Sequence, residues 1–429
     1  MGKTGEKIRR SFQYALLAVA TGGLVGILDT IFGRGLLIIS DIRNLHYRYL
    51  IPFLPVAGLA IAWLYQHFNK ESLKGMTLVF ETGQQKREEI PLALIPLVMV
   101  TTWITHLFGG SAGREGVAVQ IGATLSHALG RRCHLPENGR IMLVTGMAAG
   151  FGGLFQTPLA AVFFAMEVIV AGYLDYEALL PALIASYTSS FTSHALGLEK
   201  FVVTLTGTLD LSEKKNVFGI LILGIAFGLT GRLFSFCLQK MKKKLGEKIK
   251  SPFWRIGLGA VPLAVFLLLL HSGRYSGLGT NLIRESFHGG TVYAYDWILK
   301  LVLTIVTLAI GFQGGEVTPL FSIGATLGVV LSGILGLPAM TCAALGYAAV
   351  FGSATNTLLA PIMIGLEVFG PAEMLPFVIV CVIAYLMNGD RSIYAAQGRI
   401  EKKFHIKKIL RNCQSAFKKN SLGYFLYKN

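Results

Sequence analysis

Apolar residues dominate the chain in runs that glycines and short polar stretches interrupt. Several runs are shorter than the roughly 20 residues that a full membrane span requires. Helices that stop inside a membrane are tolerated only where protein or a water-filled cavity receives the freed backbone groups. The pattern therefore predicts tilted and half-spanning helices whose ends meet near the membrane midplane. The predicted helical runs are Ala15–Phe32, Ile51–Tyr65, Ile90–Phe108, Gly116–Leu129, Ile141–Phe151, Pro158–Ala171, Ala178–Leu196, Val217–Phe236, Ile256–His271, Trp297–Gly311, Thr318–Leu335, Cys342–Ser353, Leu358–Phe369 and Leu375–Met387.

Composition supports this assignment to the membrane. Hydrophobic residues make up 53% of the chain and charged residues only 14%, whereas about 25% of a soluble domain is charged. The sequence therefore predicts an all-α polytopic membrane protein. The net charge of +16 reflects Lys and Arg that collect at the chain ends and in predicted loops, near residues 3–10, 239–250 and 399–419. Such clusters are typical of the cytoplasmic side, and we expect a multi-pass protein of the plasma (inner) membrane with both termini cytoplasmic and no nucleic-acid partner.

The second half of the chain repeats short segments of the first half. The segment Ile121–Leu125 recurs unchanged as Ile323–Leu327. In the same register, the glycine-rich segment Gly113–Val117 lies opposite Gly315–Pro319. Further matches pair Phe151-Gly152 with Phe351-Gly352, Glu167 with Glu367, and more loosely Gly75 with Gly279, Leu78 with Leu282 and Glu81 with Glu285.

The repeat predicts two membrane halves, residues 11–196 and 217–394, joined by a more polar linker at 197–216. Residues 1–10 and 395–429 are predicted to be cytoplasmic end segments, and the basic C-terminal one is expected to lie on the membrane surface. Transporters built from repeats bind their substrate at the repeat interface, among the ends of broken helices. The two matched glycine-rich breaks therefore mark the expected site.

Glu115 lies inside the first break, after the nearly uncharged run Ile90–Phe108. A carboxylate at membrane depth is costly and is by default a functional candidate. The glycines Gly113 and Gly116 allow the backbone to approach a ligand closely, and a helix that begins at Gly116 would direct free amides toward an anion. An ionised Glu115 would fill that site itself, and a protonated Glu115 would leave it to a free anion. Alternatively, Glu115 pairs with Arg114 to close a turn.

Three segments resemble the CLC family of chloride channels and anion/proton antiporters. Gly113-Arg114-Glu115-Gly116 looks like the family signature, Gly315–Pro319 falls at the second glycine-to-proline motif, and Arg391–Tyr394 resembles the segment that supplies the inner-gate tyrosine. The resemblance implies an inverted-repeat CLC-type fold with many tilted and broken helices. It also implies a homodimer with one pathway per subunit, and it makes Glu115 a gate that alternately occupies the anion site and carries a proton.

The chain departs from the chloride-type members of that family at several motif positions. Val117 stands where they usually have proline, and Val317 stands where they have phenylalanine. Residues 74–77 read Lys-Gly-Met-Thr in place of a Gly-Ser-Gly-Ile-Pro motif. Val168 occupies the position at which many chloride/proton antiporters carry a second carboxylate.

A different carboxylate, Glu316, lies beside the second break. Together with Met76, Val317 and Thr318 it resembles the fluoride/proton antiporter branch of the family, the bacterial CLC-F proteins. That resemblance implies fluoride export by exchange for protons, with Glu115 as the gate and Glu316 acting in selectivity and proton relay. The residues predicted to bind the anion are Gly75, Met76, Gly116, Val117, Val317, Thr318 and Tyr394.

The chemistry of these residues suits a small anion and a proton. Residues 301–390 contain no Lys, Arg or His, so we expect Glu316 to lack a cationic neighbour in its own half. Burial without such a partner favours the neutral acid, which suits a proton relay. The alternative is that Glu316 caps the following helix as a fixed anion.

Fluoride is compact and strongly hydrated, so removing its water requires close, strong donors. The backbone amides at Gly116–Val117 and Val317–Thr318 and the hydroxyls of Thr318 and Tyr394 are such donors. None of them requires a cofactor or a metal.

Simpler interpretations stand beside these assignments. Without the resemblance, Met76 is better explained as a core residue and Tyr394 as an aromatic anchor at the membrane interface. Thr318 is also an ordinary N-cap before Pro319, which is compatible with lining the pore. Glu167 and Glu367 recur at helix ends in both halves and are predicted to be structural hydrogen-bonding groups. 

The sequence is compatible at first with three classes of function. The first is a coupled fluoride/proton antiporter, and the second is a passive anion channel of the same fold in which Glu115 only gates. The third is an intramembrane enzyme that uses Glu115 and Glu316 as an acid/base pair. The enzyme hypothesis fails because the sequence has no HExxH and no paired Cys/His cluster. The second carboxylate favours the coupled antiporter over the channel.

Overall fold

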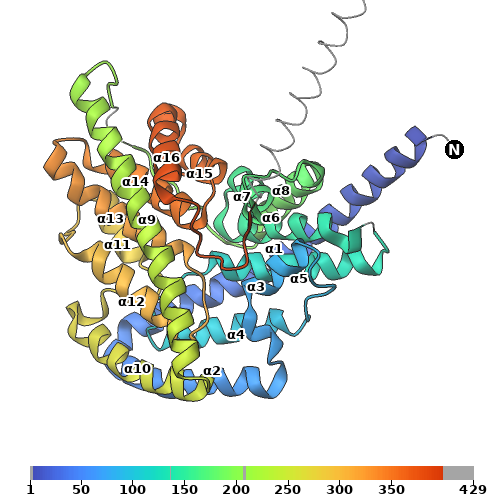
Figure 1. Cartoon of the computed structure of the whole chain (residues 1–429), viewed down its shortest axis with the longest axis horizontal. Coiled ribbons are helices and arrows are strands. Elements are labelled where there is room, and N and C mark those ends of the chain that lie inside the picture. Colours follow the sequence, from blue (N-terminus) through green and yellow to red (C-terminus); the bar gives the residue numbers. More distant parts are fainter. Residues whose placement is uncertain (1–2, 136, 206–208, 400–429) are drawn as a thin grey trace, which may run out of the picture.

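The part of the chain that the structure describes is mainly helical (Figure 1). A computed structural model describes residues 3–135, 137–205 and 209–399. The helices of the first half are α1 (Lys3–Leu50), α2 (Leu54–Phe68), α3 (Met76–Gly83), α4 (Leu94–Leu107), α5 (Glu115–Arg132), α6 (Arg140–Phe155), α7 (Pro158–Val168) and α8 (Leu179–Ala195). Those of the second half are α9 (Lys214–Lys248), α10 (Pro252–Leu269), α11 (Thr280–Phe287), α12 (Asp296–Ile310), α13 (Val317–Leu335), α14 (Ala339–Thr355), α15 (Leu359–Phe369) and α16 (Met374–Asn388). Short 3-10 turns are η1 (Ile51–Phe53), η2 (Glu71–Lys74), η3 (Glu137–Gly139), η4 (Tyr176–Ala178), η5 (His271–Gly273) and η6 (Pro371–Glu373), and two-residue strands are β1 (Val170–Ala171) and β2 (Gly398–Arg399).

Every predicted apolar run overlaps a helix, although several predicted bounds extend past the helix ends, as with Ile90–Phe108 around α4 and Pro158–Ala171 around α7. Two helices have no predicted run. These are α3 and α11, which begin after the matched glycines Gly75 and Gly279. Each has only eight residues, which is too short for its apolar positions to form a recognisable period. Their equivalent places in the chain extend the internal repeat.

Helix α9 is much longer than the run Val217–Phe236 that predicted it. It continues through a lysine-rich end to Lys248, and it packs against α12, α14 and α16 (Figure 1). Lysine is a good helix former, and its long stem covers apolar surface while the ammonium remains solvated. The basic stretch that the sequence suggests as a loop is therefore the last turns of this helix.

In each half of the chain, equivalent glycines bring two helix backbones into close contact. A Cβ on Gly122 of α5 would lie 2.1 Å from the carbonyl oxygen of Gly146 on α6. A Cβ on Gly324 of α13 would lie 2.0 Å from the carbonyl oxygen of Gly346 on α14. Only glycine lets two helix backbones approach so closely, which is a common way of packing helices in membranes.

The two halves cap each other's helices. The Glu167 carboxylate at the end of α7 accepts hydrogen bonds from the backbone amides of Leu358, Leu359 and Ala360 at 2.8–3.1 Å. The Glu367 carboxylate at the end of α15 accepts them from Leu159 and Ala160. Helix-start amides lack partners within their own helix, and a carboxylate satisfies them. The predicted structural role of both glutamates is confirmed.

Five described helical stretches are long and apolar enough to cross a membrane, namely Arg9–Phe68, Lys214–Lys248, Pro252–Leu269, Val317–Leu335 and Pro371–Asn388. Shorter apolar helices such as α7 (11 residues) and α15 (11 residues) cannot span alone. Broken and half-length helices are thus present as the sequence predicts. The basic C-terminal segment predicted on the membrane surface lies, from residue 400 onward, outside the described residues.

Candidate anion and proton site

The two matched glycine-rich breaks meet and pair. Gly113 and Gly315 form an isolated antiparallel bridge in which each backbone amide donates to the other residue's carbonyl oxygen, at 2.5 and 2.8 Å. Helix α5 starts two residues after Gly113, and helix α13 starts two residues after Gly315. The N-termini of these two helices, which come from different halves of the chain, are therefore held side by side.

Glycine is required where these backbones cross. A Cβ on Gly113 would lie 2.8 Å from Pro319 Cδ, and a Cβ on Gly315 would lie 2.9 Å from the amide nitrogen of Gly116. Contacts below 3.0 Å force the backbone apart, so a larger residue at either position opposes the bridge.

Glu115 is the first residue of α5 and is almost completely buried (1% exposed). Its Oε2 accepts hydrogen bonds from the backbone amide (3.1 Å) and the hydroxyl (2.5 Å) of Thr318, at the start of α13. Its Oε1 lies 3.6 Å from Nε of Arg114. The local pair with Arg114 is therefore present, but the carboxylate also occupies donors at the N-terminus of a helix from the other half.

Two details of the predicted donor set are corrected. The amide of Val117 donates to the carbonyl of Arg114 at 3.0 Å, so the first turn of α5 uses it internally. Thr318 is not the N-cap of α13, because the helix already begins at Val317 and Glu316 holds the N-cap position. The donors nearest to the Glu115 carboxylate are therefore the amide and hydroxyl of Thr318 in α13, and the amide of Arg114 at the start of α5 adds a longer contact of 3.4 Å. Gly116, Val117 and Val317 are buried around the carboxylate.

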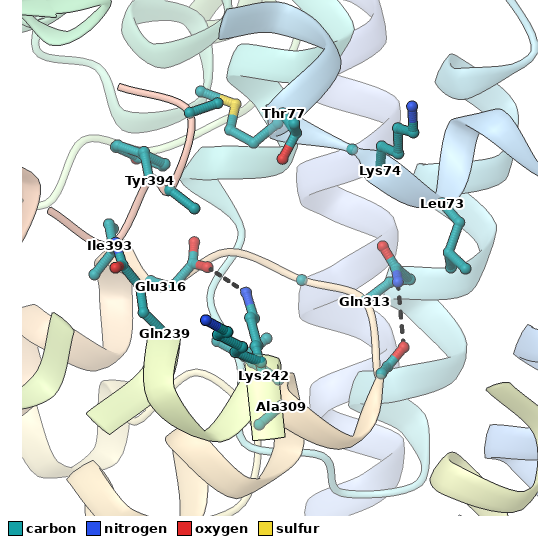
Figure 2. Close-up of a pocket in the computed structure, with 18 of the residues that line it drawn as sticks. Leu73, Lys74, Thr77, Gln239, Lys242, Ala309, Gln313, Glu316, Ile393 and Tyr394 are labelled. Carbon is teal, nitrogen blue, oxygen red and sulfur yellow. Dashed lines mark hydrogen bonds and ion pairs between the residues drawn. The ribbon is translucent and has the colours of Figure 1, made fainter. Parts of the chain in front are cut away.

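A pocket of about 740 Å³ opens beside this contact (Figure 2). It is lined by the predicted residues Gly75, Met76, Glu316 and Tyr394, whereas Glu115 and Thr318 lie outside its lining. The predicted site therefore divides into a buried carboxylate contact and an adjoining open pocket.

Met76 and Tyr394 border the pocket in different ways. Met76 is half-buried at the start of α3, where Gly75 adopts a φ of +50° that favours glycine. Tyr394 is 6% exposed, its ring lies 4.9 Å from that of Phe80, and its hydroxyl has no hydrogen-bond partner among the described residues. Such burial is inconsistent with an anchor at the membrane interface, and it leaves a free donor at the pocket wall.

Glu316 has a cationic neighbour, contrary to the expectation from residues 301–390. Nζ of Lys242, on the lysine-rich end of α9, lies 3.5 Å from Glu316 Oε1, and the two side chains point toward each other in Figure 2. Glu316 also makes no side-chain capping hydrogen bond to α13. The alternative of a fixed helix-capping anion is therefore wrong, and so is the assumption of an unpaired carboxylate. The error arose because the partner comes from an element that the sequence suggested was a loop.

Lys300, for which no role was predicted, supports the first break through hydrogen bonds. It is completely buried on α12, and its Nζ donates to Ser111 Oγ at 2.9 Å and to the carbonyls of Tyr275 and Gly277 at 3.2 and 2.7 Å. A charged residue within the otherwise apolar run of α12 was the available signal. Among the described residues, no group of three or more His, Cys, Asp or Glu side chains is arranged to hold a metal ion.

Comparison with known proteins decides the family. The profile described as "Voltage gated chloride channel" matches residues 57–389. The chain belongs to the CLC family. CLC proteins are membrane transport proteins and not enzymes, and the helical CLC-type fold predicted from the resemblance is confirmed.

Similar CLC proteins include one described as "Chloride/fluoride channel protein" from Pseudomonas syringae pv. tomato. It is 36% identical over 417 residues, which cover 93% of this chain and 91% of the relative. A solved structure described as a CLC-type fluoride/proton antiporter is 52% identical, has a TM-score of 0.89, and is matched over 91% of this chain and 98% of its own. A slow cyanobacterial Cl⁻/H⁺ antiporter, 19% identical with a TM-score of 0.76 over 89% of this chain and 96% of its own, shares the CLC fold.

Proposed function

We propose that this CLC protein is a secondary active transporter that exchanges fluoride for protons and so exports fluoride across the cytoplasmic membrane. The observation that carries the proposal is the Glu115 carboxylate seated on the amide and hydroxyl of Thr318. Two donors that already bind one carboxylate oxygen suit a small anion that is stripped of water. The 52% identical solved structure, which is a CLC-type fluoride/proton antiporter, supports the same substrate pair.

Glu115 acts as the gate in this proposal. When ionised, it occupies the Thr318 donors and excludes the free anion. When protonated, it is a weaker acceptor, and a fluoride ion takes its place. One site thus binds either the gate carboxylate or the fluoride, so the proton that releases Glu115 is coupled to the anion that enters. 

Glu316 links this site to the pocket. A Cβ on Gly116, next to the gate, would lie 3.8 Å from Glu316 Oε2, while Oε1 faces Lys242. We assign Glu316 to proton relay and anion selectivity, with Gly75, Met76 and Tyr394 lining the anion's way through the pocket and no cofactor taking part.

The placement of the protein in the cell follows from its charges. The lysine-rich end of α9 lies at the pocket, and positive clusters face the cytoplasm in membrane proteins. We therefore infer that the pocket opens to the cytoplasm and that both termini lie there. Two membrane halves with the predicted boundaries, and a homodimer with one pathway per subunit, belong to the same proposal.

A passive CLC-type anion channel is the second candidate. The Pseudomonas syringae relative supports it, because that protein is described as a chloride/fluoride channel. In a channel, Glu115 would open and close the path without carrying protons in proportion to the anion.

Flux from proteoliposomes separates these functions. Vesicles loaded with fluoride or with chloride are diluted into anion-free buffer while the released anion and the external pH are recorded together. We expect fluoride to move much faster than chloride and to drive protons uphill into the vesicles. Equal rates for both anions contradict the fluoride assignment, and fluoride efflux without uphill proton movement favours the channel.

A further inference from the structure

The two side chains of the Lys242–Glu316 ion pair differ in their exposure to solvent. The Glu316 side chain is 13% exposed, whereas the Lys242 side chain is 44% exposed and stands at the end of a flexible stem. Their separation of 3.5 Å is that of a loose pair. Water competes for the exposed ammonium, so a pair of this kind holds its exposed partner only weakly.

The pocket has a strong excess of positive charge. Glu316 is the only carboxylate among the described residues that line it, and its basic residues come from three elements and from the segment after α16. They are Lys74 of η2, Lys240, Lys242 and Lys243 of α9, Arg255 of α10, and Arg391 after α16. A concave site lined by one sign of charge concentrates ions of the opposite sign.

The other basic side chains for which a contact is assigned are engaged away from Glu316. Arg255 donates to the carbonyl of Ile310 at 3.3 Å. Lys240 and Arg391 both lie over the ring of Phe236, at 5.1 and 4.7 Å from its centroid. Lys243 lies 4.0 Å from Glu247. Lys242 is therefore the cation that faces Glu316, and on the other side the groups near Glu316 are Tyr394 and, beyond Gly116, Glu115 with Arg114.

This arrangement makes the charge of Glu316 depend on where Lys242 points. An ammonium beside a carboxylate stabilises its ionised form. If the ammonium turns to an anion in the pocket, Glu316 remains largely covered without a compensating charge, and the neutral acid is favoured. Anion binding at Lys242 and proton binding at Glu316 therefore strengthen each other, as linkage requires.

We propose that Lys242 forms an entry site for a small monovalent anion, at which fluoride competes with Glu316 and so permits that carboxylate to take up a proton. The inference rests on the proposed fluoride/proton exchange. While fluoride is held by Lys242, Glu316 accepts a proton that Glu115 has brought inward. That transfer ionises Glu115, which displaces a fluoride already at Thr318 to the outside. When Glu115 next takes up an external proton and leaves Thr318, the fluoride at Lys242 moves there, Lys242 returns to Glu316, and the proton on Glu316 leaves through the pocket. One anion thus moves outward as one proton moves inward, and no bond other than the O–H bond is made or broken.

Substitution of Lys242 tests this proposal against a matched control on the same helix. Lys242→Gln removes the charge, Lys242→Arg retains it, and Lys243→Gln removes a neighbouring charge that lines the same pocket but faces Glu247. Each full-length variant is reconstituted, and fluoride and proton fluxes are recorded together over a range of fluoride concentrations.

For Lys242→Gln we expect the fluoride concentration at half-maximal rate to rise roughly tenfold, at the low end of charge-steering effects. We also expect fewer protons to move per fluoride. Lys242→Arg should restore both quantities, and Lys243→Gln should leave the proton-to-fluoride ratio unchanged.

The outcomes distinguish this inference from the function on which it rests. If Lys242→Gln slows fluoride but keeps the proton-to-fluoride ratio, Lys242 only attracts anions and the linkage is overturned. If Lys243→Gln lowers the ratio as much, the effect belongs to total pocket charge and the specific pair is overturned. If the unaltered protein moves fluoride without uphill protons, the proposed antiport itself fails, whatever the variants do.

Discussion

The two glycine-rich breaks are equivalent in sequence and in backbone, yet their carboxylates have opposite surroundings. Glu115 is 1% exposed and hydrogen-bonded to Thr318 across the bridge between Gly113 and Gly315. Glu316 borders an open pocket and faces a solvated lysine. One break therefore holds its carboxylate in a buried, hydrogen-bonded site, and the other leaves its carboxylate beside an open pocket and a solvent-exposed cation.

This difference suits two separate tasks. A gate has to fill the anion site completely, which requires burial and direct donors. A relay has to exchange protons with water, which requires partial exposure and a partner that can move away. The repeat gives both breaks the same backbone path. Within the matched breaks the two carboxylates differ in position by one residue, so their side chains contact different neighbours.

The largest effect is expected from Glu115→Gln. Glutamine resembles the protonated side chain in shape but does not titrate, so fluoride movement should no longer drive protons. Fluoride and external pH, recorded together from loaded proteoliposomes, measure this loss. 

Glu367→Gln is the matched control for that experiment, because Glu367 is also a largely covered carboxylate but serves to cap α7. The capping variant should retain coupled exchange. Uphill proton movement in the Glu115 variant would place the gate on another residue.

An intermediate effect is expected at Thr318, which joins the two breaks. Thr318→Val keeps the shape of the side chain and removes the hydroxyl that donates to Glu115. A hydrogen bond to a charged group contributes about 1.5–3 kcal/mol, so fluoride exchange should weaken about tenfold or more. The fluoride dependence of the exchange rate measures this change. Thr318→Ser retains the hydroxyl and should stay near the original value; equal losses in both variants would point to packing as the cause.

The smallest effect, on stability, is expected from Glu316→Ala. A half-solvated ion pair contributes about 0–1 kcal/mol, so the melting temperature should change little, whereas coupled exchange or the preference for fluoride over chloride should fall. Melting temperature and flux are measured on the same preparation. 

Glu367→Ala provides the contrast on stability. It leaves two helix-start amides without their acceptor, and its melting temperature should drop clearly. Normal flux with a lowered melting temperature in the Glu316 variant would instead make Glu316 a structural residue.

Much of the site was predictable because it is encoded locally. Glycines in matched positions predicted where the helices break, and Glu115 and Glu316 stood out as carboxylates between apolar runs. The helix-end roles of Glu167 and Glu367 followed from their recurrence. Helix ends were less predictable, since the lysine-rich end of α9 has no apolar period and its helical state depends on packing and side-chain stems.

By itself, the sequence determined the membrane character of the protein, its internal repeat, its CLC resemblance and the residues from which the site is built. These properties depend on composition, on period and on motifs read along the chain. Only the tertiary structure decided the partners, namely Thr318 for Glu115, Lys242 for Glu316 and Lys300 behind the first break. The physical reason is that a hydrogen bond or ion pair depends on distances of a few ångströms. Such distances between remote residues are set by how the helices pack.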